Sequence, residues 1–337
     1  MGLWSDISRG AAYISRSRVS NLFKLYLSFW YSRVVRHPVH WGKPFAISVE
    51  PGTACTLHCP ECPTGAGVLN RPKGRMELSW YKKLLTELSP QLTVLNLYLQ
   101  GEPLLHPDFP KIVKIASDKN IYSITSTNGQ SLSEKLAQEL VLSGLSEIYI
   151  SLDGVTQKSY EKYRVGGDIE KVKDTIRILS STKKRLGRRN PSIVAQFIVF
   201  RHNEHEIAQY KKMAFELGAD RAEIKSAQFN EFGKDNVEPP QNRQFRRYSS
   251  NGGAVFNNQR YQHCWKSWMS AVFTWDGKVL PCCFDKDGDY ELGSVINDSF
   301  ETIWKGAKGD LFRRTILKSK EKIEICSNCP EGSNFFT

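Results

Sequence analysis

The 337-residue sequence lacks any long hydrophobic run. Its longest candidate, residues 22–35, is interrupted by Lys24, Ser28 and Arg33, whereas a bilayer span needs roughly 20 apolar residues. The first residues also lack the compact apolar core and small-residue cleavage site of a signal peptide. No internal repeat or low-complexity tract is present. These absences favour a globular, cytoplasmic protein that folds as one large domain or two unequal ones.

Acidic residues are scarce near the N-terminus. The net charge of the whole chain is +12, and residues 1–44 hold seven basic residues against Asp6 alone, a net +6. Aromatic and aliphatic side chains are frequent in the same segment. A basic amphipathic helix of this kind can lie on an anionic membrane surface, but we expect it to pack its apolar face on the rest of the protein. Nucleic-acid binding is not expected, because no recognition motif accompanies the basic residues, including the cluster at residues 183–189.

The eight cysteines fall into two groups, which fits metal ligation in a reducing compartment better than a disulfide framework. Cys55, Cys59 and Cys62 share one short loop with the spacing Cys-x3-Cys-x2-Cys. A closed zinc or structural iron–sulfur site takes four protein ligands. Three local thiolates without a nearby fourth therefore indicate a [4Fe-4S] cluster with one open iron. A zinc loop, a disulfide or three unrelated thiols are the alternatives.

Strands and helices alternate from residue 45 to residue 228. Because such alternation forms a parallel sheet with right-handed crossovers, we expect an α/β fold with six strand–helix units, short of the eight of a full barrel. Asn203 and Glu206 suggest a capping box for the last helix. The predicted strands are 45–50, 93–99, 121–126, 147–152, 192–200 and 221–227, and the predicted helices are 79–88 (starting at a serine), 109–119, 131–143, one or more within 158–186, and 204–217.

The cysteine loop, Thr-Ala-Cys55-Thr-Leu-His-Cys59-Pro-Glu-Cys62-Pro, closely resembles that of the radical S-adenosylmethionine (SAM) superfamily. The resemblance implies a partial (β/α)6 barrel whose open iron binds SAM. It also implies an external one-electron reductant of the flavodoxin or ferredoxin type. Reductive cleavage of SAM then gives methionine and a 5′-deoxyadenosyl radical, which removes a hydrogen atom from the substrate.

The resemblance extends to segments at the ends of the predicted strands. It implies contacts with SAM or a polar substrate, although Gly-Glu-Pro and Asn-Gly are also ordinary turn sequences. Arg164 can clamp the SAM carboxylate or form a surface ion pair instead. Gln196 and Lys225 can point into the barrel. The candidate SAM-site residues are Gly101, Glu102, Ser126, Asn128, Ser151, Asp153 and Arg164.

A second cysteine set follows a loop-like linker at residues 229–262. Zinc and a second [4Fe-4S] cluster fit its spacing equally, but the set resembles the SPASM/twitch auxiliary-cluster domain, which favours the cluster. Residues 276–277 read as the turn of a hairpin between 269–275 and 278–284, followed by helices at 299–304 and 310–319. Cys283 is a spare thiol that can replace Cys282. The expected ligands are Cys264, Cys282, Cys326 and Cys329.

These features predict an N-terminal arm (1–44), a radical SAM barrel (45–228), a linker (229–262) and an auxiliary-cluster domain (263–337). One auxiliary cluster resembles the radical SAM dehydrogenase that oxidises a cyclitol alcohol, so a sugar- or cyclitol-like alcohol is the expected substrate. The rival is a maturase of a ribosomally made peptide, which often carries a peptide-binding domain ahead of the barrel. A non-catalytic iron–sulfur or zinc protein that acts through partners is the third possibility.

Overall fold

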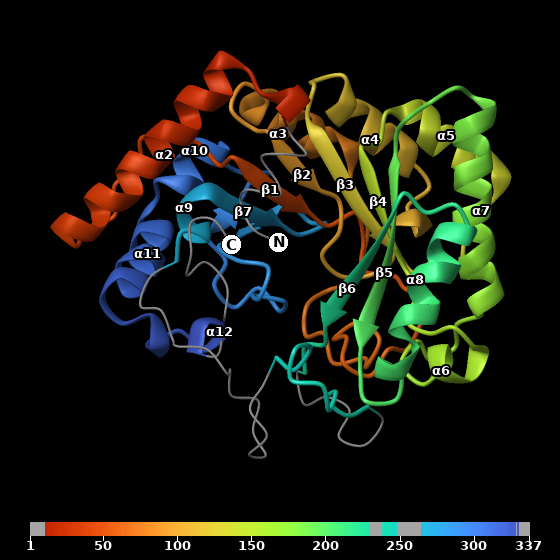
Figure 1. Ribbon diagram of the computed structural model, residues 1–337. Helices are drawn as coiled ribbons and strands as arrows, with labels where there is room; N and C mark the ends of the chain where they lie inside the picture. Colours follow the sequence, from red (N-terminus) through yellow and green to blue (C-terminus); the bar gives the residue numbers. More distant parts are fainter. Residues whose placement is uncertain (1–10, 230–236, 248–263, 328, 330–337) are drawn as a thin grey trace.

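The computed structural model describes residues 11–229, 237–247, 264–327 and 329. Within these residues one sheet runs through the molecule in the strand order β6-β5-β4-β3-β2-β1-β7-β8-β9 (Figure 1). Strands β1 to β6 pair in parallel, as predicted for an α/β fold. The strands are β1 Ala46–Val49, β2 Val94–Asn96, β3 Tyr122–Thr127, β4 Glu147–Ser151, β5 Ser192–Val199, β6 Arg221–Ser226, β7 Ser270–Phe273, β8 Lys278–Leu280 and β9 Gly293–Ser294.

Helices connect the parallel strands and cover the outer face of the sheet, where α3, α4, α5, α7 and α8 lie side by side (Figure 1). None of the helices in the described ranges is long and apolar enough to cross a membrane. The α-helices are α2 Arg16–Val35, α3 Leu78–Leu88, α4 Phe109–Ser117, α5 Glu134–Ser143, α6 Gln157–Glu161, α7 Ile169–Arg185, α8 Ile207–Glu216, α9 Lys266–Met269, α10 Phe300–Trp304, α11 Ala307–Ser319 and α12 Glu324–Ser327, and the 3-10 helices are η1 Ala11–Tyr13, η2 Pro103–Leu105, η3 Glu204–Glu206 and η4 Lys320–Lys322.

The central strands of the sheet, such as β1, β3 and β4, are buried on both faces. Ile47 of β1 belongs to the large core beneath the outer helices, whereas its neighbour Ala46 belongs to a second core on the concave face. This alternation follows from the two-residue period of a strand. Leu25 of α2 and Trp268 of α9 join the inner core. The N-terminal and C-terminal segments therefore fill the inside of the partial barrel together.

Two details of the predicted helix starts are wrong. Asn203 and Glu206 do not form a capping box: the Asn203 side chain accepts a hydrogen bond from the Phe200 amide, and the Glu206 carboxylate accepts one from the Val155 amide. Both side chains thus tie down neighbouring strand ends, and η3 leads into α8 instead. α3 begins at Leu78 without a side-chain cap, so its start is not set by a serine.

The predicted hairpin at residues 276–277 is confirmed. β7 and β8 pair antiparallel, and Gly277 takes the positive φ of 75° that this turn requires. The structure adds a pairing that the sequence did not indicate, because β7 also pairs in parallel with β1 along its whole length. The C-terminal segment therefore extends the sheet of the barrel. The division at residues 229–262 stays a prediction, of which 237–247 and residue 229 lie within the described part.

The N-terminal arm packs differently from the expectation. The face of α2 that lies against the protein is mixed: it buries Leu25 and Phe29, but also Arg18, Asn21, Ser28 and Ser32. Most large apolar side chains of the helix point outward. A polar inner face is possible because most of its groups have hydrogen-bond partners, Arg18 Nε being an exception. The Arg18 guanidinium, for example, donates to four backbone carbonyl oxygens beyond the ends of α3 and α4 and in the arm.

Candidate functional site

The cysteine loop leaves the carboxyl end of β1, which is the edge where parallel α/β folds place their chemistry. Cys59 and Leu57 are buried in a small apolar cluster with Tyr163 and Phe200. The loop is fixed by backbone hydrogen bonds, from Cys62 to the Cys59 carbonyl (3.2 Å) and from His58 to Val165 (2.9 Å). These contacts hold the three thiols against the segment that follows β4.

The three thiols influence one another. Burial raises the pKa of Cys55 and raises that of Cys59 to about 11, and the neighbouring Cys62 adds to both shifts. Two side chains donate toward the sulfurs: Asn128 Nδ2 lies 3.6 Å from Cys55 Sγ, and Arg164 Nη1 lies 3.7 Å from Cys59 Sγ. N–H donors of this kind stabilise the thiolates of an iron–sulfur site and tune its potential. The donor set therefore fits a cluster with three protein ligands.

Glu102 follows β2 and caps the start of η2, and its carboxylate is hydrogen-bonded within the protein. Its carboxylate accepts hydrogen bonds from Thr127 Oγ1 (2.8 Å), the Asn128 amide (2.7 Å) and the Leu104 amide (3.1 Å). Burial raises its pKa, although these bonds act in the opposite direction. The geometry makes Glu102 a link between the ends of β2 and β3. Its predicted contact with SAM stays a prediction.

Gly101 explains how the cysteine loop can lie so close to β2. Its φ is +73°, and a Cβ atom there would stand 2.4 Å from the Gly52 carbonyl oxygen. The next amide, that of Glu102, donates to the Ala54 carbonyl at 2.7 Å. The backbone of the cysteine loop and the end of β2 therefore touch directly, which only glycine permits.

Asp153 and Arg164 form a buried ion pair, so the alternative of a surface pair is wrong. The exposed fractions of their side chains are 0% and 13%. Burial acts to lower the pKa of Arg164, but the charges of Asp153, Cys59 and two tyrosines together raise it above its ordinary value. The second carboxylate oxygen of Asp153 accepts from the Ile198 amide at 2.6 Å. The predicted SAM clamp would have to use the terminal nitrogens of Arg164, because its Nε already donates to Asp153.

Ser126 and Ser151 lie near the carboxyl ends of β3 and β4. Ser126 stands opposite Tyr149 in the sheet, and Ser151, which is buried, stands opposite Gln196 of β5. Parallel pairing brings these strand ends to the same edge as the cysteine loop. Lys225 is exposed on β6. The roles of all these residues toward SAM or substrate stay predictions.

Two further features of this region were missed by the sequence analysis. Gln100 Oε1 accepts from Thr64 Oγ1 at 2.9 Å and lies 3.8 Å from Cys62 Sγ. Glu50, buried at the end of β1, pairs with Arg71 and also accepts from the Trp275 amide at 3.2 Å. A charged residue ending a buried strand was the available signal, because such a charge requires a partner.

Some cysteines of the second set also lie close to one another. Cys264 is buried in the inner core. The hydrogen bond with Cys283 and burial raise the pKa of Cys282, burial raises that of Cys326 to about 12, and the Cys264 thiol adds to both shifts. Cys329 follows Cys326 by one turn, with its amide 3.4 Å from the Cys326 carbonyl. Cys283 is exposed and interacts with Cys282. Across the described residues, no three His, Cys, Asp or Glu side chains are close enough to hold a single metal ion.

Comparison with known families accounts for this geometry. Residues 49–214 match the Radical SAM superfamily, and residues 264–330 match SPASM, an iron–sulfur cluster-binding domain. This chain belongs to the radical SAM superfamily. Membership implies a [4Fe-4S] cluster and SAM as cofactors, and the SPASM domain implies auxiliary iron–sulfur binding. The predicted fold, a radical SAM barrel with a small SPASM domain, is confirmed.

Individual radical SAM proteins resemble this chain over different lengths. PqqA peptide cyclase from Bradyrhizobium diazoefficiens is 27% identical over 56% of this chain, which spans only 48% of that protein. The structure of BtrN in complex with AdoMet and 2-DOIA has a TM-score of 0.53 at 19% identity, covering 87% of this chain and 95% of BtrN. Streptococcus suis SuiB bound to its precursor peptide SuiA has a TM-score of 0.61 at 13% identity, covering 89% and 72%.

Proposed function

We propose that this protein is a radical SAM oxidoreductase that removes two electrons from a sugar- or cyclitol-like alcohol. One observation carries the proposal: the chain has a single auxiliary cysteine set, Cys264, Cys282, Cys326 and Cys329. Its fold matches that of BtrN over 95% of the BtrN chain. BtrN itself was crystallised in complex with AdoMet and 2-DOIA. A likeness of fold does not fix a substrate, so the substrate class rests on analogy.

The residues of the barrel have separate tasks in this proposal. With the cluster and SAM bound, this site supplies a carbon-centred radical that removes one hydrogen atom from the substrate. Cys55, Cys59 and Cys62 hold the cluster, while Asn128 and Arg164 donate toward two of the sulfurs. Glu102 and Gly101 keep the loops around it in register. Ser126, Ser151 and Asp153 are the proposed polar contacts for SAM or substrate.

Water must be kept away from so reactive a species. Tyr163 and Phe200 are buried beside Cys59, with their ring centroids 4.6 Å apart. Leu57 completes this apolar wall on the cysteine loop. Their packing gives the radical a dry surrounding on one side of the site.

The auxiliary set completes the oxidation. After loss of a hydrogen atom from its C–H bond, the substrate gives up a second electron and the hydroxyl proton, and a carbonyl forms. Cys264, Cys282, Cys326 and Cys329 would hold the auxiliary cluster, which would supply the one-electron acceptor for this oxidation, with an external electron carrier as the final acceptor. The exposure of Cys283 and the proximity of Cys282 to Cys264 favour Cys282 as the ligand.

Modification of a ribosomally made peptide is the second candidate. It is supported by two of the similar proteins, a PqqA peptide cyclase and SuiB bound to a precursor peptide. Hydrogen abstraction is common to both candidates. They differ in the substrate that must bind beside the cysteine loop.

Anaerobic reconstitution tests the cofactor assignment. Two clusters correspond to about eight irons per chain. Dithionite and SAM should give 5′-deoxyadenosine, and replacement of Cys55, Cys59 and Cys62 by alanine should abolish it. Four irons with one zinc per chain would contradict the auxiliary cluster, and absence of SAM cleavage by the fully loaded protein would favour a non-catalytic binding role.

A second experiment addresses the oxidation itself. Sugars and cyclitols deuterated at the carbinol carbon should transfer deuterium to 5′-deoxyadenosine and yield a ketone. In the double variant Cys326→Ala and Cys329→Ala, SAM cleavage should persist while ketone formation is lost, whereas Cys283→Ala should retain both. Ketone formation at the wild-type rate by the folded double variant would make the cluster structural. Deuterium transfer from peptides alone would establish the second candidate.

A further inference from the structure

The outward face of α2 is a continuous apolar stripe. Val19, Phe23, Leu27, Trp30 and Val34 follow one another at spacings of three and four residues, so they lie on one side of the helix. All of them are exposed, with Phe23 at 62% and Val34 at 81%. A surface helix of a globular protein normally turns such a stripe toward the core. Here the stripe faces away from it.

The helix cannot roll to bury this stripe, because its opposite face is fixed. The Phe29 ring meets Trp265 and Trp268 edge-on, with centroids 5.2 and 5.3 Å apart. Asn21 donates to the Lys43 carbonyl and accepts from the Lys43 amide. Arg18 adds its bonds to four carbonyl oxygens. The orientation of α2 is therefore built into the fold.

Positive charge borders the stripe. α2 contains no acidic residue, and its cations include Arg16, Lys24 and Arg33, the last of which lies 4.5 Å above the Trp30 ring. α11 lies on the same side of the molecule (Figure 1), where Arg314 reaches His37 after the end of α2. α11 also carries an exposed leucine and two exposed lysines: Leu311, Lys308 and Lys318.

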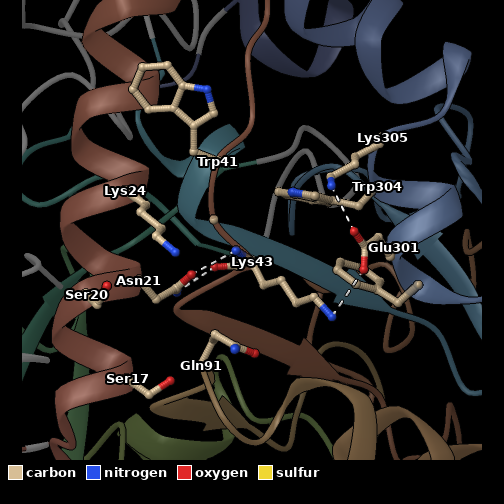
Figure 2. Close-up of a pocket in the computed structure, with 12 residues that line it drawn as sticks. Ser17, Ser20, Asn21, Lys24, Trp41, Lys43, Gln91, Glu301, Trp304 and Lys305 are labelled. Carbon is tan, nitrogen blue, oxygen red and sulfur yellow. Dashed lines mark hydrogen bonds and ion pairs between the residues drawn. The ribbon is translucent and has the colours of Figure 1, made fainter.

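A cavity of about 220 Å³ opens beside α2, between the helix, the segment 41–43 and α10 (Figure 2). Lys24 lines one wall, next to the half-exposed Trp41. On the opposite wall Lys43 and Lys305 share Glu301, at 3.5 and 2.8 Å. Lys43 also lies 3.9 Å from Glu87, so three lysines and two carboxylates leave a net positive charge, which suits a phosphate group.

We propose that the outward face of α2 docks this protein on an anionic membrane surface. Phe23, Trp30 and Val34 enter the boundary between headgroups and acyl chains, as the apolar face of an interfacial helix does. Arg16, Lys24 and Arg33 meet the lipid phosphates, and the cavity beside Lys24 takes one headgroup. The carboxyl edge of the sheet, with its cysteine loop, plays no part in this contact.

Vesicle sedimentation of the intact protein tests the proposal. We expect binding to vesicles of equal parts phosphatidylcholine and phosphatidylglycerol, and much weaker binding to phosphatidylcholine alone. Lys24→Glu and Arg33→Glu should each weaken binding about fivefold or more, because a basic residue near an anionic surface contributes about 1 kcal/mol. The double variant Phe23→Ser and Trp30→Ser should weaken it at least about tenfold by removing buried apolar area.

Control substitutions on other surfaces of the protein distinguish this contact from non-specific vesicle binding. Phe215, 56% exposed on α8, and Lys171, exposed on α7, serve as controls. Phe215→Ser and Lys171→Glu should leave vesicle binding unchanged. No binding of the wild type to the anionic vesicles, or equal loss in the control variants, would overturn the proposal. Sedimentation velocity gives a further test. A wild-type dimer that the double variant Phe23→Ser and Trp30→Ser dissociates would also overturn the proposal, because the stripe would then be covered by a second copy of the chain.

Discussion

At the scale of single residues, Arg18 is the cation that anchors α2. Its carbonyl acceptors belong to Tyr13, Ser89, Lys119 and Asn120, at 2.5 to 3.2 Å, near the C-terminal ends of α3 and α4 where a positive charge is favourable. Arg18→Met should lower the free energy of unfolding by about 3 kcal/mol, since buried bonds to a charged donor are lost. Arg16→Met, an exposed change in the same turn, should alter it by less than about 0.5 kcal/mol. Urea unfolding measures both, and equal effects would contradict the anchoring role.

His40 makes stability depend on pH. Its ring stacks on Trp268, both ring nitrogens are buried, and burial, aided by the charges of Arg313 and Lys305, lowers its pKa to about 2. The unfolded chain therefore binds the proton first, and this contribution to stability is present above about pH 6.5 and declines as the pH falls below that value. Between pH 7 and pH 5 the loss should be about 2 kcal/mol, at about 1.4 kcal/mol per pH unit below pH 6.5.

The variant His40→Phe keeps a ring against Trp268 and removes the titrating group. Its free energy of unfolding should fall less steeply between pH 7 and pH 5 than that of the wild type, by the same amount. Identical slopes for the two proteins would mean that His40 does not sense pH in this range.

Residue identities in the site were more predictable than their contacts. The cysteine spacing gave the loop of Cys55, Cys59 and Cys62 because its ligands are close in sequence. Glu102 and Arg164 could be named from their positions after strands. Their pairing with Thr127 and Asp153 could not be predicted. Thr127 lies on β3, and Asp153 follows β4 in the same connection as Arg164, so which side chains meet is set by tertiary packing that a local pattern does not contain.

At the scale of elements, Gly101 and Gly67 offer a matched pair of loop glycines. Both have φ of +73°, but a Cβ at Gly67 would meet nothing within 4 Å, whereas one at Gly101 would strike the backbone of the cysteine loop. Gly67→Ala should therefore cost about 1 kcal/mol, the penalty of the left-handed conformation alone. Gly101→Ala should cost at least about 2 kcal/mol more and lower the iron content. Thermal unfolding and iron analysis would show the difference, and equal losses would contradict the close approach.

The elements themselves followed well from periodicity. Each predicted strand and helix of the barrel is present, with ends shifted by a few residues, because alternation and helical spacing are local signals. The predicted capping box is absent because Asn203 and Glu206 accept hydrogen bonds from the amides of Phe200 and Val155 instead. The prediction for α2 was wrong for a related reason, because hydrogen bonds from Arg18 and Asn21 decide which face of the helix is buried.

At the scale of the whole molecule, the sheet does not end where the barrel motif ends. β7 covers the edge of β1, and Ala271 and Phe273 enter the core beneath the outer helices. A chain shortened to end at Phe229 should therefore be largely insoluble or unfold at a clearly lower temperature, since each large apolar side chain removed from the core costs about 1.5–3 kcal/mol. The full-length double variant Cys326→Ala and Cys329→Ala is the control, because it keeps the sheet. A soluble shortened barrel with the wild-type Tm would contradict this dependence.

The pairing of β7 with β1 also has a consequence for biosynthesis. Val49 and its partner Phe273 are separated by more than 200 residues. At translation rates of about 5–20 residues per second, the nascent chain carries β1 with one open edge for on the order of ten seconds or more. An uncovered edge strand is prone to pair with other chains. Iron–sulfur loading of the adjoining cysteine loop is thus expected to follow release from the ribosome, and the maturing protein should depend on chaperones during that interval.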